Sequence, residues 1–496
     1  MPEELNLKEN KIFIENTNVF EKWAEEGEHK AQEKTRTLLK SYLELDNVSF
    51  LFGTGSTIML GAKSIQNIPK EIEDGLKTNK EAYQEFIEII IGLTKVADEK
   101  QLPRTEEKDG NEIKYMLEEF LNYLLALEYA QSKFEGIVKY KKIKDIISIT
   151  KRELFKLCDI DTRVIPTWLS SDVKLKLKNN KYWYHELFTK KILQRPLNLR
   201  RVNIFTTNYD LAFDEAFDHL GVHYINGFSG FHRRTFKPEN FDYDIYFPGS
   251  TTQGKVQRVE KVLKYYKIHG SLTWQQTTPT ANNVYGIEEW SIKHIREKIK
   301  KDEASKVTTN ENDFWNNLMI YPSAAKKSYT LDYPYSELFR QLAATLNQPQ
   351  SVLITYGYSF CDEHINDIIY QALTIPSFTL IIIDFKGTEG SKEIKRLREL
   401  CDPRIIIIQG NQLGDFPYFT EKLLPDFIGS NINEKIAKTL SMLYPDDGQL
   451  KADIQEVEEK TIENKEQKVE NKAEDDGKES DIVQTSSDQD TEDLPF

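Results

Sequence analysis

The sequence has few of the features that mark metal-ribbon, secreted or membrane-spanning proteins. Its 496 residues include three cysteines, Cys158, Cys361 and Cys401, and no Cys-x-x-Cys pair, which argues against a zinc ribbon and fits a reducing compartment. The longest apolar runs, such as 380–383 and 405–408, have the length of strands, whereas a membrane span needs about 20 apolar residues. The N-terminus shows no basic segment followed by an apolar one, so we expect a cytoplasmic protein without membrane association.

Positive charge is also scarce. The formal net charge is −14 at pH 7, and residues 446–496 contain 18 acidic and 6 basic residues, so most of the excess lies in this tail. A protein that coats nucleic acid would be basic, and the overall balance argues against that class while leaving local basic patches open. Residues 446–496 also lack aromatic residues until Phe496, which predicts a disordered acidic tail that cannot bury a core.

Four short segments share one pattern, in which an apolar, β-rich run ends in small or polar residues. They are FLFGTGST (50–57), IFTTNYD (204–210), YYKIHGS (265–271) and ITYGYSF (354–360). In an open α/β sheet, ligands bind at the carboxyl ends of the strands. We therefore expect the four segments to line one crevice of an α/β fold with a Rossmann-like, mostly parallel sheet. Small residues there would let a nucleotide approach the backbone.

The spacing of these segments predicts large helical insertions in the α/β fold. The stretch between the first strand and the strand at 202–206 is much longer than a crossover connection requires. We divide the chain into an N-terminal helical segment (1–45), a nucleotide-binding domain (46–445) and the tail (446–496). Helical insertions are expected at about 60–200 and 282–318, with Trp290 and Trp315 as apolar anchors of the second.

Asn208 and His269 are the tip residues best suited to sugar chemistry. An amide offers a donor and an acceptor, and an imidazole exchanges a proton near neutral pH. The GTGST turn lacks the lysine of a P-loop and the third glycine of a dinucleotide fingerprint, but its amides, with Ser56 and Thr57, can hold a diphosphate at a helix start. An isolated Asn or His is more often structural, so the prediction depends on their occurring together with Gly-rich tips.

Taken together, the four segments resemble the sirtuin-like NAD-consuming family over about residues 45–410. GTGST resembles that family's Gly-Ala-Gly phosphate turn, and TTNYD its Thr-Gln-Asn-Ile-Asp motif. KIHGS is similar to the segment with the catalytic histidine, and YGYSF to the Gly-Thr-Ser turn that holds the ribose-phosphate. The resemblance implies Asn208 and His269 as the catalytic residues. The NAD-binding residues that it implies are Gly53, Thr54, Gly55, Ser56, Thr206, Asp210, Gly357, Tyr358, Ser359 and Asp384.

The chain lacks the two cysteine pairs of the zinc module that deacylase sirtuins carry. The resemblance therefore favours the bacterial branch that hydrolyses NAD as an effector of antiphage defence. We expect an NAD glycohydrolase that releases nicotinamide and ADP-ribose through an oxocarbenium-like state, with no zinc or other metal and no cofactor beyond NAD as substrate. The alternative is a non-catalytic subunit of a DNA-associated complex that senses NAD or ADP-ribose.

Constant hydrolysis of NAD would starve the cell, so the resemblance also implies control. We expect it from a homo-oligomer, from the helical insertions, or from a partner such as a DNA-translocating ATPase or a phage trigger. The C-terminal Asp-Leu-Pro-Phe resembles the tip of bacterial single-stranded-DNA-binding proteins, in which an acidic linker ends in an apolar residue with a free carboxylate. It predicts docking into the pockets that receive such tips, and the alternative is a solubilising tail.

Overall fold

The computed structural model of the chain describes residues 9–63, 68–99, 117–134, 136, 138–196, 198–247, 257–259, 261–305, 312–320 and 333–426. The chain divides into two units, 1–427 and 428–496, and all described residues belong to the first. The predicted acidic tail therefore lies outside the described residues. Within the described ranges, no helix is both long enough and apolar enough to cross a membrane.

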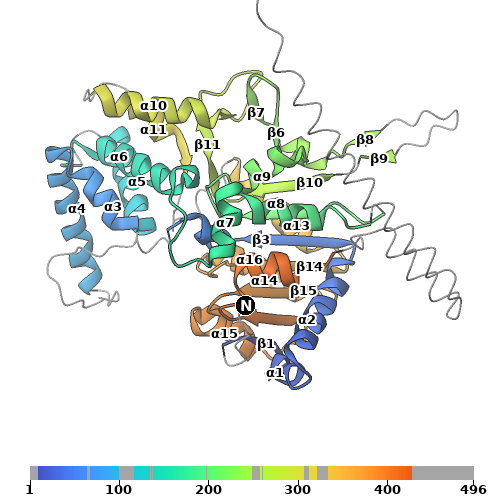
Figure 1. Cartoon of the computed structure of the whole chain (residues 1–496). Coiled ribbons are helices and arrows are strands. Elements are labelled where there is room, and N and C mark those ends of the chain that lie inside the picture. The colour runs from blue at the N-terminus through green and yellow to red at the C-terminus, as the bar shows by residue number, and fades with distance from the viewer. Residues whose placement is uncertain are drawn as a thin grey trace, which may run out of the picture. The chain divides into compact units, whose positions relative to one another are not determined.

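The main sheet has the strand order β2–β1–β16–β15–β14–β3–β4–β10–β5, and all neighbours from β16 to β5 are parallel (Figure 1). Its strands are β1 (Lys11–Ile14), β2 (Thr17–Asn18), β3 (Asn47–Phe52), β4 (Asn203–Thr206), β5 (His223–Ile225), β10 (Val262–Lys267), β14 (Ser351–Tyr356), β15 (Thr379–Asp384) and β16 (Ile405–Gln409). From β10 to β16 this is the dinucleotide-binding order 3-2-1-4-5-6, in which the strand order reverses between β3 and β14. The predicted Rossmann-like, mostly parallel sheet is confirmed.

Helices cover both faces of this sheet, which explains why its strands are apolar on both sides. In β3, for example, Phe50 and Phe52 belong to the apolar cluster on one face, and Leu51 belongs to the cluster on the other. The first face is covered by α1 (Val19–Ala24), α2 (Glu28–Leu43), α8 (Trp183–Ile192), α9 (Ala212–Leu220), α16 (Phe416–Tyr418) and the π-helical turn Phe419–Leu423. The second face is covered by α13 (Tyr335–Leu346), α14 (Glu363–Leu373) and α15 (Lys392–Glu399).

Figure 1 shows helices from both regions that the sequence marks as insertions. Their buried apolar side chains form a third cluster. The helices are α3 (Ile68–Leu76), α4 (Lys80–Glu99), α5 (Leu117–Lys133), α6 (Ile143–Cys158), α10 (Ile292–Ser305) and α11 (Asn312–Asn317). Phe155 of α6 packs against Trp315 of α11 with ring centroids 5.9 Å apart. Trp315 is buried and Trp290 is partly buried in this cluster. The two segments therefore share one core, whereas α8, which also lies between β3 and β4, packs on the main sheet.

A second, smaller sheet contains the strand that begins directly after His269. Its strands, in the spatial order β13–β11–β12–β7–β6, are β13 (Leu318–Ile320), β11 (Gly270–Gln276), β12 (Ile287–Glu289), β7 (Arg234–Phe236) and β6 (Phe228–Ser229). A separate hairpin contains β8 (Tyr246–Phe247) and β9 (Gln257–Arg258), and α7 (Ser171–Asn179) precedes α8. His269 therefore lies in the short connection between β10 of the main sheet and β11 of the second sheet, and both of its flanking segments are held in a sheet.

The N-terminal segment differs from the predicted helical stretch over 1–45. Helices α1 and α2 form, but β1 precedes them and pairs antiparallel with β16, with Lys11 opposite Gln409. Ile12 and Phe13 are buried by this pairing. The four residues of β1 are too few to show a helical or strand period, and their partner lies near the other end of the described chain, so the local sequence carries no signal for them.

Candidate functional site

The four Gly- or His-containing tips lie at one edge of the main sheet. Their strands, β14, β3, β4 and β10, are consecutive neighbours and run parallel, so their carboxyl ends face the same way. In the pairing of β4 with β10, Thr206 stands opposite Lys267. Asn208 and His269 each follow two residues later in the chain. The two residues predicted to be catalytic therefore leave neighbouring strands at the same level.

The Gly-rich turns after β3 and β14 pack against each other backbone to backbone. The N–H of Gly55 donates to the carbonyl of Gly357 at 3.2 Å, and that of Gly53 donates to the carbonyl of Tyr356 at 3.0 Å. A Cβ on Gly53 would lie 2.4 Å from the Gly357 oxygen, and a Cβ on Gly357, whose φ is +56°, would lie 2.5 Å from Gly55 Cα. Thr54 lies between the two glycines in a short 3₁₀ turn. Contact between the two turns thus requires these glycines at the point where the strand order reverses.

Asn208 ties the turn after β3 to the end of β4. Its side chain is buried, and Nδ2 donates to the carbonyl of Gly53 at 3.1 Å and to Oγ of Ser56 at 3.3 Å. Its backbone N–H donates to Oγ1 of Thr206 at 3.0 Å, and that hydroxyl donates to the carbonyl of Phe52 at 3.2 Å. The side-chain amide of Asn208 therefore fixes the shape of the turn that is predicted to bind phosphate.

Beneath the tips lies a buried polar network that includes Asp210. Lys267, which is 3% exposed, donates from Nζ to the carbonyl of Asp210 and, at 3.0 Å, to Oδ2 of Asp214. Burial raises the pKa of the Asp210 carboxyl, while Lys267 and a hydrogen bond from Thr57 oppose the rise. The network joins the end of β10 to the start of α9. The sequence did not indicate a role for Lys267, because a lysine at the end of an apolar strand usually faces solvent.

His269 is paired with a carboxylate. Its Nε2 lies 2.8 Å from Oδ2 of Asp362, and the two side chains are 13% and 4% exposed. Asp362 is the N-cap of α14, and its Oδ1 accepts the N–H of His364 at 3.1 Å. The Tyr209 ring lies near the imidazole, with centroids 6.5 Å apart. Sequence reasoning missed this partner, since an acid at a helix start is explained by capping and the helix dipole alone.

Three residues predicted to bind NAD have other contacts in this structure. Tyr358 packs into the core beside α14, where its hydroxyl donates to the carbonyl of Asp362 at 3.3 Å. Ser359 is exposed, and its carbonyl accepts the hydroxyl of Ser391 at 3.1 Å. Asp384 closes its own turn by accepting two backbone N–H groups, and burial raises the pKa of its carboxyl. The side chains of Tyr358 and Asp384 thus hold the loops that frame the sheet edge.

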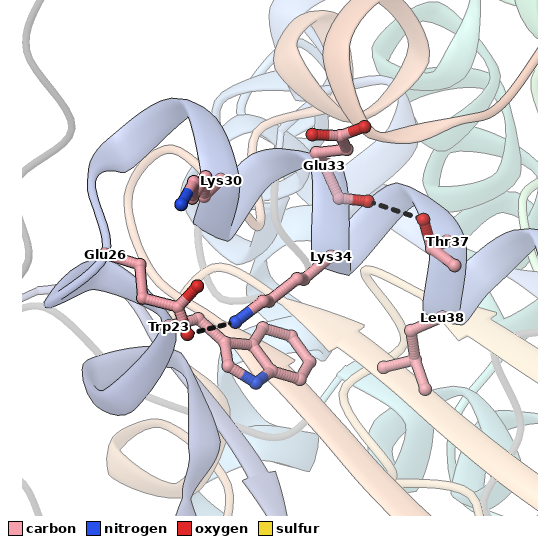
Figure 2. Close-up of a pocket in the computed structure, with 7 residues that line it drawn as sticks. All are labelled: Trp23, Glu26, Lys30, Glu33, Lys34, Thr37 and Leu38. Atoms are coloured by element: carbon pink, nitrogen blue, oxygen red, sulfur yellow. Dashed lines mark hydrogen bonds and ion pairs between the residues drawn. The ribbon is translucent and has the colours of Figure 1, made fainter.

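A groove of about 530 Å³ lies on α1 and α2 (Figure 2). Its lining residues are Trp23, Glu26, Lys30, Glu33, Lys34, Thr37 and Leu38. Lys34 pairs with Glu26, and the hydroxyl of Thr37 donates to the carbonyl of Glu33 at 2.9 Å. The groove includes none of the strand-end residues, and its mixed charges offer no preference for a diphosphate.

Metal-binding side chains do not gather in the part of the chain that the structure describes. No group of three or more His, Cys, Asp or Glu residues there is arranged to hold a metal ion. Cys361 and Cys401 are exposed and free, and burial raises the pKa of Cys158 to about 12, which disfavours a metal-binding thiolate.

Comparison with known proteins identifies a family match that lies mostly in the second half of the described chain. No curated protein matches the chain. The family described as the SIR2-like domain matches residues 202–399, from the start of β4 to the end of α15. The matched segment includes Asn208, His269, Asp362 and the turn at Gly357, and it leaves β3 and the GTGST turn outside. The resemblance to the sirtuin-like family is confirmed over this range. Residues 202–399 of this chain match the SIR2-like domain, as the motif resemblance to the sirtuin-like family predicts.

Proposed function

We propose that this protein is an NAD glycohydrolase, which cleaves the nicotinamide–ribose bond of NAD to give nicotinamide and ADP-ribose. A SIR2-like domain indicates an NAD-related activity. Hydrolysis of the nicotinamide–ribose bond is the specific reaction that we infer. The observation that carries it is the common level of Asn208 and His269 on neighbouring strands. They stand beside the reversal point of a sheet with the dinucleotide-binding strand order, which is where such sheets bind ligands.

The reaction suits these residues. The glycosidic bond breaks through an oxocarbenium-like state, so catalysis depends on positioning and electrostatics more than on a covalent intermediate. His269 would take a proton from the attacking water or from a ribose hydroxyl. Asn208 shapes the turn of Gly53 and Ser56, whose amides would face the diphosphate, and its amide oxygen would accept from a ribose hydroxyl.

A second candidate is a module that senses NAD or ADP-ribose without turnover. The contacts of Asn208 favour it, because its amide N–H groups already serve the turn after β3. The glycines of the two turns are likewise explained by their mutual packing. A binding site needs no more than this, whereas hydrolysis also requires His269 as a base. Turnover therefore separates the two functions.

The test is release of nicotinamide from NAD by the full chain, with NAD binding measured separately by a thermal shift. We expect His269→Ala to lower turnover by about 10²-fold or more and to leave NAD binding in place. His223→Ala is the matched control, because His223 is an exposed histidine on β5. Wild-type protein that binds NAD and releases no nicotinamide, with or without DNA, an ATPase or phage protein, would favour the sensing module.

We further propose that the enzyme acts in the cytoplasm as a regulated effector of bacterial antiphage defence, which stops infection by depleting NAD. Control would come from a homo-oligomer or from a partner such as a DNA-translocating ATPase or a phage trigger. The C-terminal Asp-Leu-Pro-Phe, outside the described residues, would dock into pockets that receive the tips of single-stranded-DNA-binding proteins. Phe496→Ala should abolish binding to a purified partner that carries such a pocket, and equal binding would remove the idea.

A further inference from the structure

The pair formed by His269 and Asp362 spans the carboxyl edge of the main sheet. His269 follows β10 and Asp362 follows β14, and β3 and β4 lie between these strands. The 2.8 Å contact between Nε2 and Oδ2 therefore crosses the region where the proposed substrate binds. We propose that Asp362 is the positioning residue of His269 and that the two side chains act as one unit in hydrolysis. This inference rests on the proposed function and adds a residue that the motif resemblance did not mark.

Asp362 is held in place by several independent contacts. Its Oδ1 caps α14 by accepting the N–H of His364, and its carbonyl accepts the hydroxyl of Tyr358 at 3.3 Å. The preceding Phe360 has a φ of +57°, which is rare for a residue with a side chain, and its carbonyl accepts Nδ2 of Asn366 at 2.8 Å. The loop has little freedom, so Oδ2 is aimed at His269.

The pairing decides which nitrogen of His269 can act as a base. An ionised carboxylate only accepts hydrogen bonds, so Nε2 carries the proton that it shares with Asp362. In the neutral ring the lone pair then lies on Nδ1. During hydrolysis, nicotinamide leaves with the electrons of the C–N bond and water forms the new C–O bond at the same carbon. The proton that water loses passes to Nδ1, and Asp362 stabilises the imidazolium that results.

The same contact between His269 and Asp362 could also serve only to hold the end of β10 against α14, without a role in catalysis. Asp362→Asn separates the two roles. Asparagine caps a helix as well as aspartate, so α14 keeps its N-cap and the side chain keeps its size. The amide nitrogen at the place of Oδ2 is a donor, however, and it can bond to Nε2 only if the ring proton moves to Nδ1. If the contact only holds the structure together, it survives this change of tautomer. If Nδ1 is the base, the proton on Nδ1 removes the base and activity is lost.

The kinetic test compares wild type, Asp362→Asn, His269→Ala and the double variant. We expect Asp362→Asn to lower kcat by about 10²-fold or more, with KM for NAD within about twofold and an unchanged thermal midpoint. In the His269→Ala background the same change should cause no further loss, because residues that act as a unit are not additive. Ser170→Ala is the control, since it removes the N-cap of α7 and should leave kcat unchanged. Wild-type kcat in Asp362→Asn would overturn the proposal.

A second measurement does not depend on turnover. In ¹⁵N spectra of histidine-labelled protein, the signal lost in His269→Ala identifies this ring. We expect the Nε2–H form in wild type and the Nδ1–H form in Asp362→Asn. The same form in both proteins would overturn the pairing. If wild type releases no nicotinamide, the proposed function fails, and the spectra still decide whether Asp362 sets the state of His269.

Discussion

His185 links the stability of the main core to pH. Its ring is fully buried on α8, with centroids 4.8 Å from that of Phe213 and 4.9 Å from that of Phe416. Neither ring nitrogen has a hydrogen-bond partner among the described residues. Burial lowers the pKa of this imidazole from 6.5 to about 3. The native protein therefore holds a neutral ring under conditions in which the unfolded chain binds a proton.

The sign and size of the effect follow from this difference. The unfolded state gains the proton as the pH falls below 6.5, and the folded state gains it only near pH 3. Stability from this residue is complete above pH 6.5 and declines between these values. Each pH unit in this window costs about 1.4 kcal/mol, so the free energy of unfolding at pH 5 should be about 2 kcal/mol lower than at pH 7.5 through His185 alone.

The assay is urea unfolding of wild type and His185→Leu at pH 7.5 and pH 5. Leucine is close to imidazole in size and has no polar atoms, so the variant should be at least as stable at pH 7.5 and should lose about 2 kcal/mol less on acidification. The exposed His223→Leu serves as the control and should behave as wild type. Equal losses in wild type and His185→Leu would refute the reasoning, because the buried ring would then bind its proton as readily as the unfolded chain does.

Three further predictions concern stability and are measured by chemical unfolding. Gly357→Ala should destabilise the protein by clearly more than Gly221→Ala, which has a similar φ of +60° but open space around its Cβ and should cost about 1–2 kcal/mol; equal costs would show that the two turns can separate. Lys267→Met should cost about 3–5 kcal/mol, since the pair of the buried Lys267 with the partly buried carboxylate of Asp214 is lost and that carboxylate is left without its cation. Lys11→Met at an exposed pair should cost less than about 1 kcal/mol, and a small loss at both sites would contradict this. Burial raises the pKa of Asp415 to about 6, so ionisation lowers stability as the pH rises from 3.8 to 6, and Asp415→Asn should stabilise the protein by up to about 3 kcal/mol at pH 7.5 and leave it unchanged at pH 3.5; a gain of equal size at both pH values would point to packing.

The sequence predicted the sheet and the position of the tips because both signals are local. An apolar run followed by Gly, Asn or His marks a buried strand and its carboxyl end, and β3, β4, β10 and β14 all show it. Because ligands bind at such strand ends, the sequence alone predicts that the four segments lie at one edge of the sheet. The roles assigned to Asn208 and His269 remain predictions, which the nicotinamide assay decides.

Pairings between distant segments were not predictable. Nothing near Asp362 in the chain indicates that its second oxygen meets His269, 93 positions away. Two other features also join segments that are distant in the chain and were therefore not predictable. They are the packing of Gly53 against Gly357 and the common core of the two helical regions. A residue pattern shows which face of an element is buried, but not which other element covers it. Likewise, the sequence predicts that Tyr358 binds the nucleotide, but it does not show that the Tyr358 ring packs beside α14.

Because β1 pairs with β16, this edge of the main sheet can form only after nearly all of the described chain has been synthesised. Asn10, just before β1, bonds to Asn411, which lies 401 positions later. β1 thus leaves the ribosome long before its partner strand β16, and it lacks that partner until almost all of the described chain has been made. A nascent or truncated chain that stops before residue 405 exposes the whole border of β15, a six-residue apolar strand. Among the residues that the structure describes, the short strand β2 lies beyond β1 on that side. A six-residue apolar strand without a partner, which would favour aggregation, is therefore expected at this edge in incomplete chains.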